Sequence, residues 1–223
     1  MKIAIDGPAG SGKSTVAKGI SKALSIPYLD TGSVYRAFGY IAREKGINLV
    51  ETQELLSLFE DPLLVKIGIA ITEVFYKDKK LERELKGEEV GKYASLVGSV
   101  PAFRERMIIF FRNIVGDAQV VAEGRDVGTH IFPDAPIKLF ITASPEERAK
   151  RRFLELTAVG VKTTYQEVLS ALLERDKRDM ERPLYPFRPA EDAIILDTTH
   201  MSAEEVIEQI LSIIKEKAPH LRI

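Results

Sequence analysis

Residues 2–24 read KIAIDGPAGSGKSTVAKGISKAL, and this run sets the architecture expected for the rest of the chain. The isoleucine-containing segment Lys2–Asp6 predicts a strand, and apolar residues spaced by three and four from Val16 onward predict a helix. Between them, Gly7–Ser14 fits the pattern G-x-x-x-x-G-K-[ST] of a P-loop. The backbone N–H groups of such a loop surround the phosphates of a nucleoside triphosphate. The opening therefore predicts a strand, a phosphate-binding loop and a helix.

Each part of this loop has its own function in binding phosphate. Glycines let the backbone approach an anion closely, and the first turn of the following helix adds its positive end. Lys13 can reach the β and γ phosphates, and the Ser14 hydroxyl can face Mg²⁺. A GTP-binding switch is disfavoured, because the chain has neither the Asp-x-x-Gly nor the Asn-Lys-x-Asp pattern of those proteins. The loop thus indicates the ligand and leaves the reaction open.

Beyond the loop, short apolar runs alternate with helix-like stretches. The strands expected from these runs are Tyr28–Leu29, Gln119–Ala122, Ile137–Ile141 and Ala193–Leu196. Alternation of this kind predicts an α/β fold with a mostly parallel sheet, covered on both faces. Capping boxes that begin at Ser144, Thr164 and Ser202 predict the starts of further helices.

One stretch interrupts the alternation. β-Branched and aromatic residues between Leu63 and Val90, with a charged turn at Lys77–Lys80, predict two or three antiparallel strands in an inserted subdomain. A second interruption, Leu156–Thr164, is expected to be a loop between two arginine-bearing helices.

Composition excludes several classes of function. The formal net charge is -1, so no overall field attracts nucleic acid or an anionic membrane. The chain has no cysteine, which excludes disulfides, thiolate catalysis and cysteine-ligated metal centres. No run of residues approaches the ~20 apolar residues that a membrane-spanning helix needs. We expect a cytoplasmic protein that binds neither nucleic acid nor membranes.

Arginines are concentrated in one part of the chain. Nearly half of them fall between residues 148 and 188, where they could grip phosphate groups or pair with the many acidic residues nearby as a solvated helix face. Glu123-Gly124-Arg125-Asp126 directly follows one expected strand, and Asp30-Thr31-Gly32 follows another. Ligands of open α/β sheets bind at the carboxyl ends of strands, so these turns favour the phosphate-binding interpretation.

The acceptor in a phosphoryl transfer decides which side chains are needed. A phosphate monoester has its second pKa near ~6 and is already an anionic nucleophile at neutral pH, so it needs arginines and no general base. An alcohol usually needs a carboxylate to take its proton. Many arginines therefore favour a phosphate acceptor, while Asp30 and Asp126 keep a hydroxyl kinase open as an alternative.

Together these segments resemble the bacterial cytidylate kinases. The resemblance is carried by GPAGSGKST at 7–15, LDTGSVYR at 29–36, ASLVGSVPAFRERM at 94–107, EGRDVGTHIFPDAPIKLFITASPEERAKRR at 123–152 and ERDKRDMERPLYPFRPAEDAIILDTT at 174–199. It implies Mg²⁺- and ATP-dependent phosphorylation of CMP and dCMP by a single kinase domain, expected to be a monomer. It also implies a P-loop NTPase-like three-layer core with a five-stranded parallel sheet, formed by residues 1–33, 102–150 and 177–223. A monophosphate-binding subdomain with a small antiparallel sheet would span 34–101, and a short lid 151–176.

The resemblance also implies roles for individual residues. ATP would bind at Gly7, Pro8, Ala9, Gly10, Ser11, Gly12, Lys13, Ser14 and Thr15, with Ser14 on the metal and Arg148 beside the base. Lys13, Arg125, Arg151 and Arg152 would act on the transferring phosphoryl group. CMP would bind at Thr31, Arg36, Ser95, Arg104, Arg125, Asp126, Arg175, Asp179 and Arg182, with Ser95, Arg104 and Asp126 reading cytosine and Asp179 a ribose hydroxyl.

Two positions depart from the family pattern. Glu123 stands where some members have aspartate, and Glu181 stands where a serine is expected. Two alternatives to a cytidylate kinase stay open, namely another P-loop kinase of small molecules and a nucleotide-binding regulator without catalysis.

Overall fold

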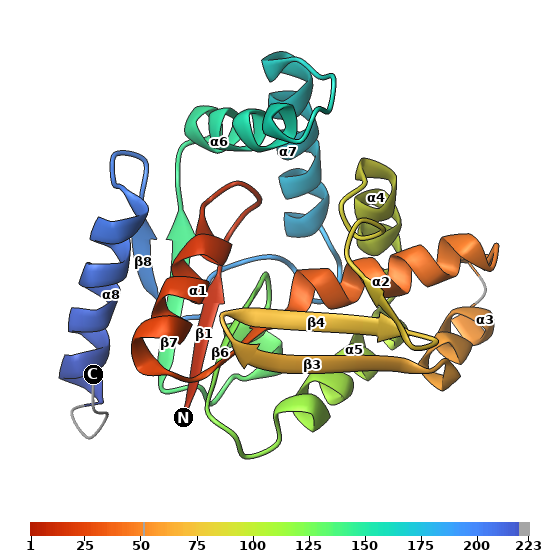
Figure 1. The fold of residues 1–223 in the computed structure, drawn as a ribbon, viewed down its shortest axis with the longest axis horizontal. Coiled ribbons are helices and arrows are strands. Elements are labelled where there is room, and N and C mark those ends of the chain that lie inside the picture. The colour runs from red at the N-terminus through yellow and green to blue at the C-terminus, as the bar shows by residue number, and fades with distance from the viewer. Residues whose placement is uncertain (51, 219–223) are drawn as a thin grey trace.

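The computed structural model describes residues 1–50 and 52–218. These residues form three layers around one sheet, with strand order β5-β4-β3-β2-β6-β1-β7-β8 (Figure 1). Residue 51 of the expected subdomain and residues 219–223 of the expected core lie outside the described residues.

The central strands are parallel, as the alternating sequence predicts. They are β1 (Lys2–Asp6), β2 (Pro27–Asp30), β6 (Val120–Gly124), β7 (Ile137–Thr142) and β8 (Ile194–Asp197). Both faces of β1 are buried, because Ile3 and Ile5 belong to one apolar cluster and Ala4 to the other. Burial on both faces explains the continuous apolar runs of β1 and β6, whereas the edge strand β8 leaves Ile195 exposed.

Two pairs of long helices cover the faces. α1 (Lys13–Leu24) and α8 (Ala203–Lys217) share a cluster with β1 and β7. α2 (Thr31–Glu44) and α5 (Pro101–Val115) share the opposite cluster, against which the short helices α3 (Thr52–Leu56) and η1 (Ser57–Glu60) pack. None of the helices among the described residues is both long and apolar enough to cross a membrane.

The inserted segment forms β3 (Leu63–Ile69), β4 (Ile71–Tyr76), β5 (Lys79–Leu81) and helix α4 (Glu88–Val97). Its strands are antiparallel as expected, but they do not form a separate sheet. β3 pairs with β2 through Pro27↔Ile69 and Tyr28↔Gly68, so the hairpin extends the central sheet. Thr72 of β4 reinforces this junction, since its hydroxyl donates to the Tyr28 carbonyl (2.8 Å) and accepts from the Asp30 N–H (2.9 Å).

α6 (Pro145–Ala158) and α7 (Tyr165–Met180) pack together beyond the carboxyl edge of the sheet (Figure 1). The loop between them is shorter than the predicted Leu156–Thr164, because α6 continues to Ala158. The capping boxes predicted at Thr164 and Ser202 are both present. At Ser144 the hydroxyl accepts from the Glu147 N–H, while the Glu147 carboxylate accepts from Arg151 Nε (3.0 Å). In this third predicted capping box, the Glu147 side chain therefore binds Arg151 in place of the N-cap backbone.

The contact between α2 and α4 depends on a glycine. A Cβ at Gly39 would lie 2.6 Å from the backbone nitrogen of Ala94, whereas a Cβ at Gly87 would meet nothing within 4 Å. We predict that Gly39→Ala lowers the free energy of unfolding by about 1–3 kcal/mol, although alanine is the better helix former. The control Gly87→Ala meets no atoms and should lower it by only about 0.5 kcal/mol, because alanine is a weaker N-cap of α4 than glycine. Urea unfolding of both variants checks this, and equal values would show that α4 can move away from α2 at little cost.

Candidate active site

The P-loop leaves β1 at Asp6 and enters α1 at Lys13. Gly12 lies just before the helix with φ 83°, a left-handed conformation that favours glycine. No side chain among the described residues caps this helix start, so the N–H groups of its first turn remain available to an anion. Ser14 and Thr15 are exposed there, and Lys13 Nζ donates to the Pro8 carbonyl (3.2 Å).

Arg148 of α6 supports this loop from the side of α6 and α7. The Arg148 side chain is buried, donates to the carbonyls of Ala9 (3.2 Å) and Ala143 (3.1 Å), and pairs with Asp176 of α7 (2.5 Å). The sequence analysis expected Arg148 beside the ATP base. In the structure its guanidinium joins the P-loop to α7.

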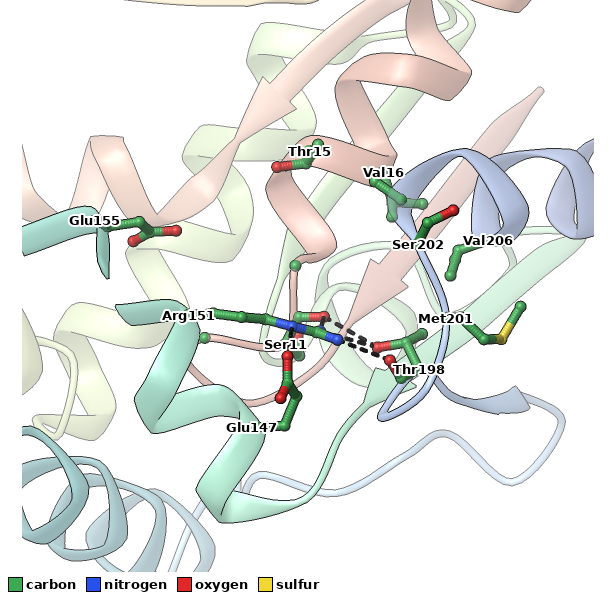
Figure 2. A pocket seen from close by; sticks show the side chains of 13 residues that line it. Ser11, Thr15, Val16, Glu147, Arg151, Glu155, Thr198, Met201, Ser202 and Val206 are labelled. Carbon is green, nitrogen blue, oxygen red and sulfur yellow. Dashed lines mark hydrogen bonds and ion pairs between the residues drawn. The ribbon is translucent and has the colours of Figure 1, made fainter. Parts of the chain in front are cut away.

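A pocket of about 310 Å³ is lined on one side by the P-loop residues Gly10, Ser11 and Gly12. Arg151 lies across it, and donates to the carbonyls of Ser11 (3.3 Å) and Thr198 (2.7 Å), as Figure 2 shows. The remaining wall comes from α1, α6, the segment after β8 and the start of α8, and its lining includes Thr15, Val16, Met201, Ser202 and Val206. The sequence analysis missed this segment after β8, although its position at the carboxyl end of a strand was the signal that could have found it. Arg152, on the next position of α6, pairs with Glu155 of the same helix (3.1 Å).

A second group of charges lies between β6 and α7. Arg125, Arg175 and Arg182 form ion pairs with the Asp179 carboxylate, at 2.5 Å for Arg125 and 4.0 Å for Arg175. Asp179 is 1% exposed, so its carboxylate is a counter-ion for the arginines. Burial, together with the neighbouring Arg125, lowers the pKa of Arg175 to about 9. Arg125 Nη1 and Arg175 Nε are buried and make no well-aligned hydrogen bond among the described residues, and the same holds for Asp179 Oδ2 and Asp176 Oδ1 beside them. Because the three arginines outnumber the carboxylates that face them, the group carries excess positive charge, which a phosphate would balance.

Arg104 and Asp126 form a separate buried pair. Arg104 Nη1 lies 2.5 Å from Asp126 Oδ2, and Arg104 Nε donates to the Gly98 carbonyl (2.9 Å) at the end of α4. The Arg104 guanidinium also lies over the Tyr35 ring, 5.3 Å from its centroid. The structure thus brings together two residues that are far apart in the sequence and that were predicted to act on the same base.

Three further residues that were predicted to bind CMP lie beside these two groups of charged side chains. Thr31 begins α2, and its hydroxyl donates to the Glu123 carbonyl (2.8 Å). Arg36 donates to the carbonyls of Leu85 (3.0 Å) and Gly87 (3.3 Å) in the inserted segment. Ser95 is half-buried on α4.

Glu123 was noted in the sequence only as a departure, and the structure places it next to the loop. It is 2% exposed and accepts a hydrogen bond from the Tyr28 hydroxyl, while its Oε2 atom has no hydrogen-bond partner among the described residues. Burial and the charge of Asp30 raise the pKa of Glu123, an effect that nearby Lys13 and a hydrogen bond with Ser14 oppose. A carboxylate oxygen beside the Ser14 hydroxyl is the donor type that Mg²⁺ prefers. The residues present therefore fit a magnesium ion.

Comparisons with known proteins identify the family of the chain. The family model described as cytidylate kinase matches residues 3–216. A cytidylate kinase of Aquifex aeolicus is 55% identical over 98% of this chain and 97% of its own length. One from Thermosipho melanesiensis is 46% identical over 97% of each chain. A solved structure of an uncharacterized protein from Eubacterium ventriosum shares the fold alone, with a TM-score of 0.53 and 16% identity over 96% of this chain and 98% of that one. Because the family model and the curated relatives cover almost the whole chain, this protein belongs to the cytidylate kinase family.

Proposed function

We propose that the protein transfers the γ-phosphoryl group of ATP to CMP or dCMP, giving ADP and CDP or dCDP. The observation that carries this proposal is the arginine group around Asp179, with its buried donors on Arg125 and Arg175. These donors lie at the same sheet edge as the P-loop, because Arg125 directly follows β6, the strand next to β1. A phosphate held there is a nucleophile without losing a proton to the protein.

The two carboxylates that could serve a hydroxyl acceptor are already engaged. Asp30 caps α2, where its oxygens accept from the Ser33 N–H (2.9 Å) and the Ser33 hydroxyl (2.5 Å). Asp126 is buried in its pair with Arg104. With neither carboxylate available as a base, the geometry favours a phosphate acceptor over an alcohol.

ATP would bind through the P-loop residues Gly7–Thr15, with its base in the pocket that Arg151 crosses. Lys13 and Arg151 would stabilise the charge on the transferring group, and Arg148 would keep the loop in place from the side of α6. Ser14 and Glu123 would hold Mg²⁺, which when bound neutralises charge on the phosphates.

On the acceptor side, Arg125, Arg175 and Arg182 would bind the CMP phosphate. Arg104 and Asp126, with Ser95, would read cytosine, whose amino group and ring acceptors suit a carboxylate beside an arginine. Thr31 and Arg36 would complete the site, and Asp179 would both hold the arginines and face the ribose.

The first prediction tests the loop. Burial lowers the pKa of Lys13, so its ammonium group gains most when a phosphate is bound beside it. Lys13→Ala should lower kcat by about a hundredfold or more and leave thermal unfolding unchanged. Lys22→Ala, at the exposed end of the same helix, is the matched control and should keep full turnover. Coupled measurement of ADP checks both variants, and a loss below about tenfold for Lys13→Ala would contradict its role.

The second prediction concerns the acceptor. CMP and dCMP should react faster than UMP and AMP, and Arg104→Met should reduce this preference because it leaves Asp126 without its partner. Arg106→Met changes an exposed arginine on the same helix and should leave the preference intact. Values of kcat/KM for the four monophosphates measure this. Faster reaction of AMP than CMP in the wild type would mean that another kinase activity is correct, and no turnover of any acceptor would favour the non-catalytic regulator.

The third prediction concerns closure of residues 151–176 over the substrates. The buried apolar cluster that α6 and α7 share is small, formed by Ala149, Leu156, Val168 and Leu172, and the other ties of α7 to the core are ion pairs that bound phosphates can rearrange. Closure would bring Arg151 and Arg152 onto the phosphates and exclude water. Hydrogen exchange of residues 150–182 should be fast in the free protein and slow with CMP plus a nonhydrolysable ATP analogue. Equal exchange with and without both ligands would show that the arginines form a static, solvated face.

A further inference from the structure

Asp6 is a buried acid that the proposed mechanism does not use. It is the last residue of β1, is 4% exposed, and directly precedes the P-loop. Its side chain turns away from the loop. Oδ1 accepts from the Val127 N–H and Oδ2 from the Gly128 N–H, each at 2.8 Å. Both oxygens thus bind backbone amides in the turn that follows β6 and begins with Asp126.

This turn positions Asp126, which is proposed to recognise the base. Asp126 is followed by the short π-helical turn η2 (Val127–Ile131), and its carbonyl accepts from the N–H groups of His130 (2.9 Å) and Ile131 (3.1 Å). The Asp126 side chain reaches Arg104, which in turn reaches the end of α4. A chain of direct contacts therefore runs from Asp6 to Asp126, Arg104 and the inserted segment.

Keeping an acid at this position has a physical cost. Burial raises the pKa of Asp6 to about 7, and the two amide hydrogen bonds and Lys13 only partly oppose this, while the charge of Asp126 adds to it. An apolar residue would avoid that cost, but it would leave two buried N–H groups without acceptors. The carboxylate is thus the group that can hold both amides at once.

We propose that Asp6 is a positioning residue for base recognition: by holding the two amides that follow Asp126, it sets where Asp126 and Arg104 meet the acceptor base. This inference rests on the proposed function, since it needs a base that the Asp126 and Arg104 pair distinguishes. It assigns Asp6 no contact with either substrate.

The test is Asp6→Asn, which keeps the shape and replaces one acceptor oxygen by an NH₂ group that cannot accept an N–H. Dissociation constants for CMP and UMP are measured by calorimetry, alongside KM for ATP. The CMP-over-UMP preference should fall at least about tenfold, while KM for ATP changes less than about threefold. An unchanged preference in the variant, or equal weakening of CMP, UMP and ATP, would overturn the proposal. If the wild type bound UMP and CMP with equal affinity, that result would instead refute the proposed function.

A second variant keeps the test decisive if Asp6→Asn does not fold. A Cβ at Gly128 would lie 3.3 Å from Asp6 Oδ2 and 3.4 Å from Lys138 Cγ and Cδ, so the larger Gly128→Val should push the turn away while Asp6 stays intact. It should lower the CMP-over-UMP preference in the same way, and an unchanged preference would again overturn the proposal.

The matched control is Ser21→Ala. The buried Ser21 hydroxyl donates to the Ile26 carbonyl (2.5 Å) and accepts from the Ala70 N–H (2.8 Å), so it joins backbone segments away from the turn. Its loss should lower stability and leave the preference between CMP and UMP unchanged. A tenfold loss of preference in this control would show that any destabilisation has the same effect, and would overturn the specific role of Asp6.

Discussion

The parallel pairing of β1 with both β6 and β7 is the constraint on which the site depends. In this register Asp6 lies opposite Gly124 of β6 and Phe140 of β7, so the P-loop and the turn at Arg125 and Asp126 leave the sheet at the same edge. The apolar side chains on both faces hold that register, because a shift by one residue would exchange the residues that face α1 with those that face α5. The packing of the core thereby determines which polar groups meet at its rim.

At that rim, buried charges contact one another in groups. Asp179 pairs with Arg125, Arg175 and Arg182 without balancing their charge, Asp176 pairs with Arg148, and Asp126 pairs with Arg104. Burying such pairs adds little to stability, because the loss of hydration offsets their attraction. Their value lies in position, because each aspartate fixes the place of the arginines that it contacts. The lowered pKa of Arg175 indicates that this group still gains from added negative charge.

Local patterns predicted much of this structure. The P-loop between β1 and α1, the capping boxes at Thr164 and Ser202, and the antiparallel strands after Leu63 each depend on residues close together in the chain. The resemblance to cytidylate kinases then predicted a set of arginines, and the structure brings Arg125, Arg175 and Arg182 together around Asp179. The junction of β3 with β2 was not predictable in the same way, because strand pairing depends on which edge of the sheet is open.

The sequence by itself determined the phosphate-binding loop, the α/β class and the residue types available at the ends of the strands, because glycine geometry, apolar periodicity and helix capping act over a few residues. Only the tertiary structure decided what each polar side chain does. Arg148 supports the loop, Glu147 pairs with Arg151, Glu123 turns toward Ser14, and Asp6 holds the turn after Asp126. Each of these contacts, except the one within α6, joins residues distant in the chain, and a buried polar group takes whichever partner the packed core brings within hydrogen-bond distance.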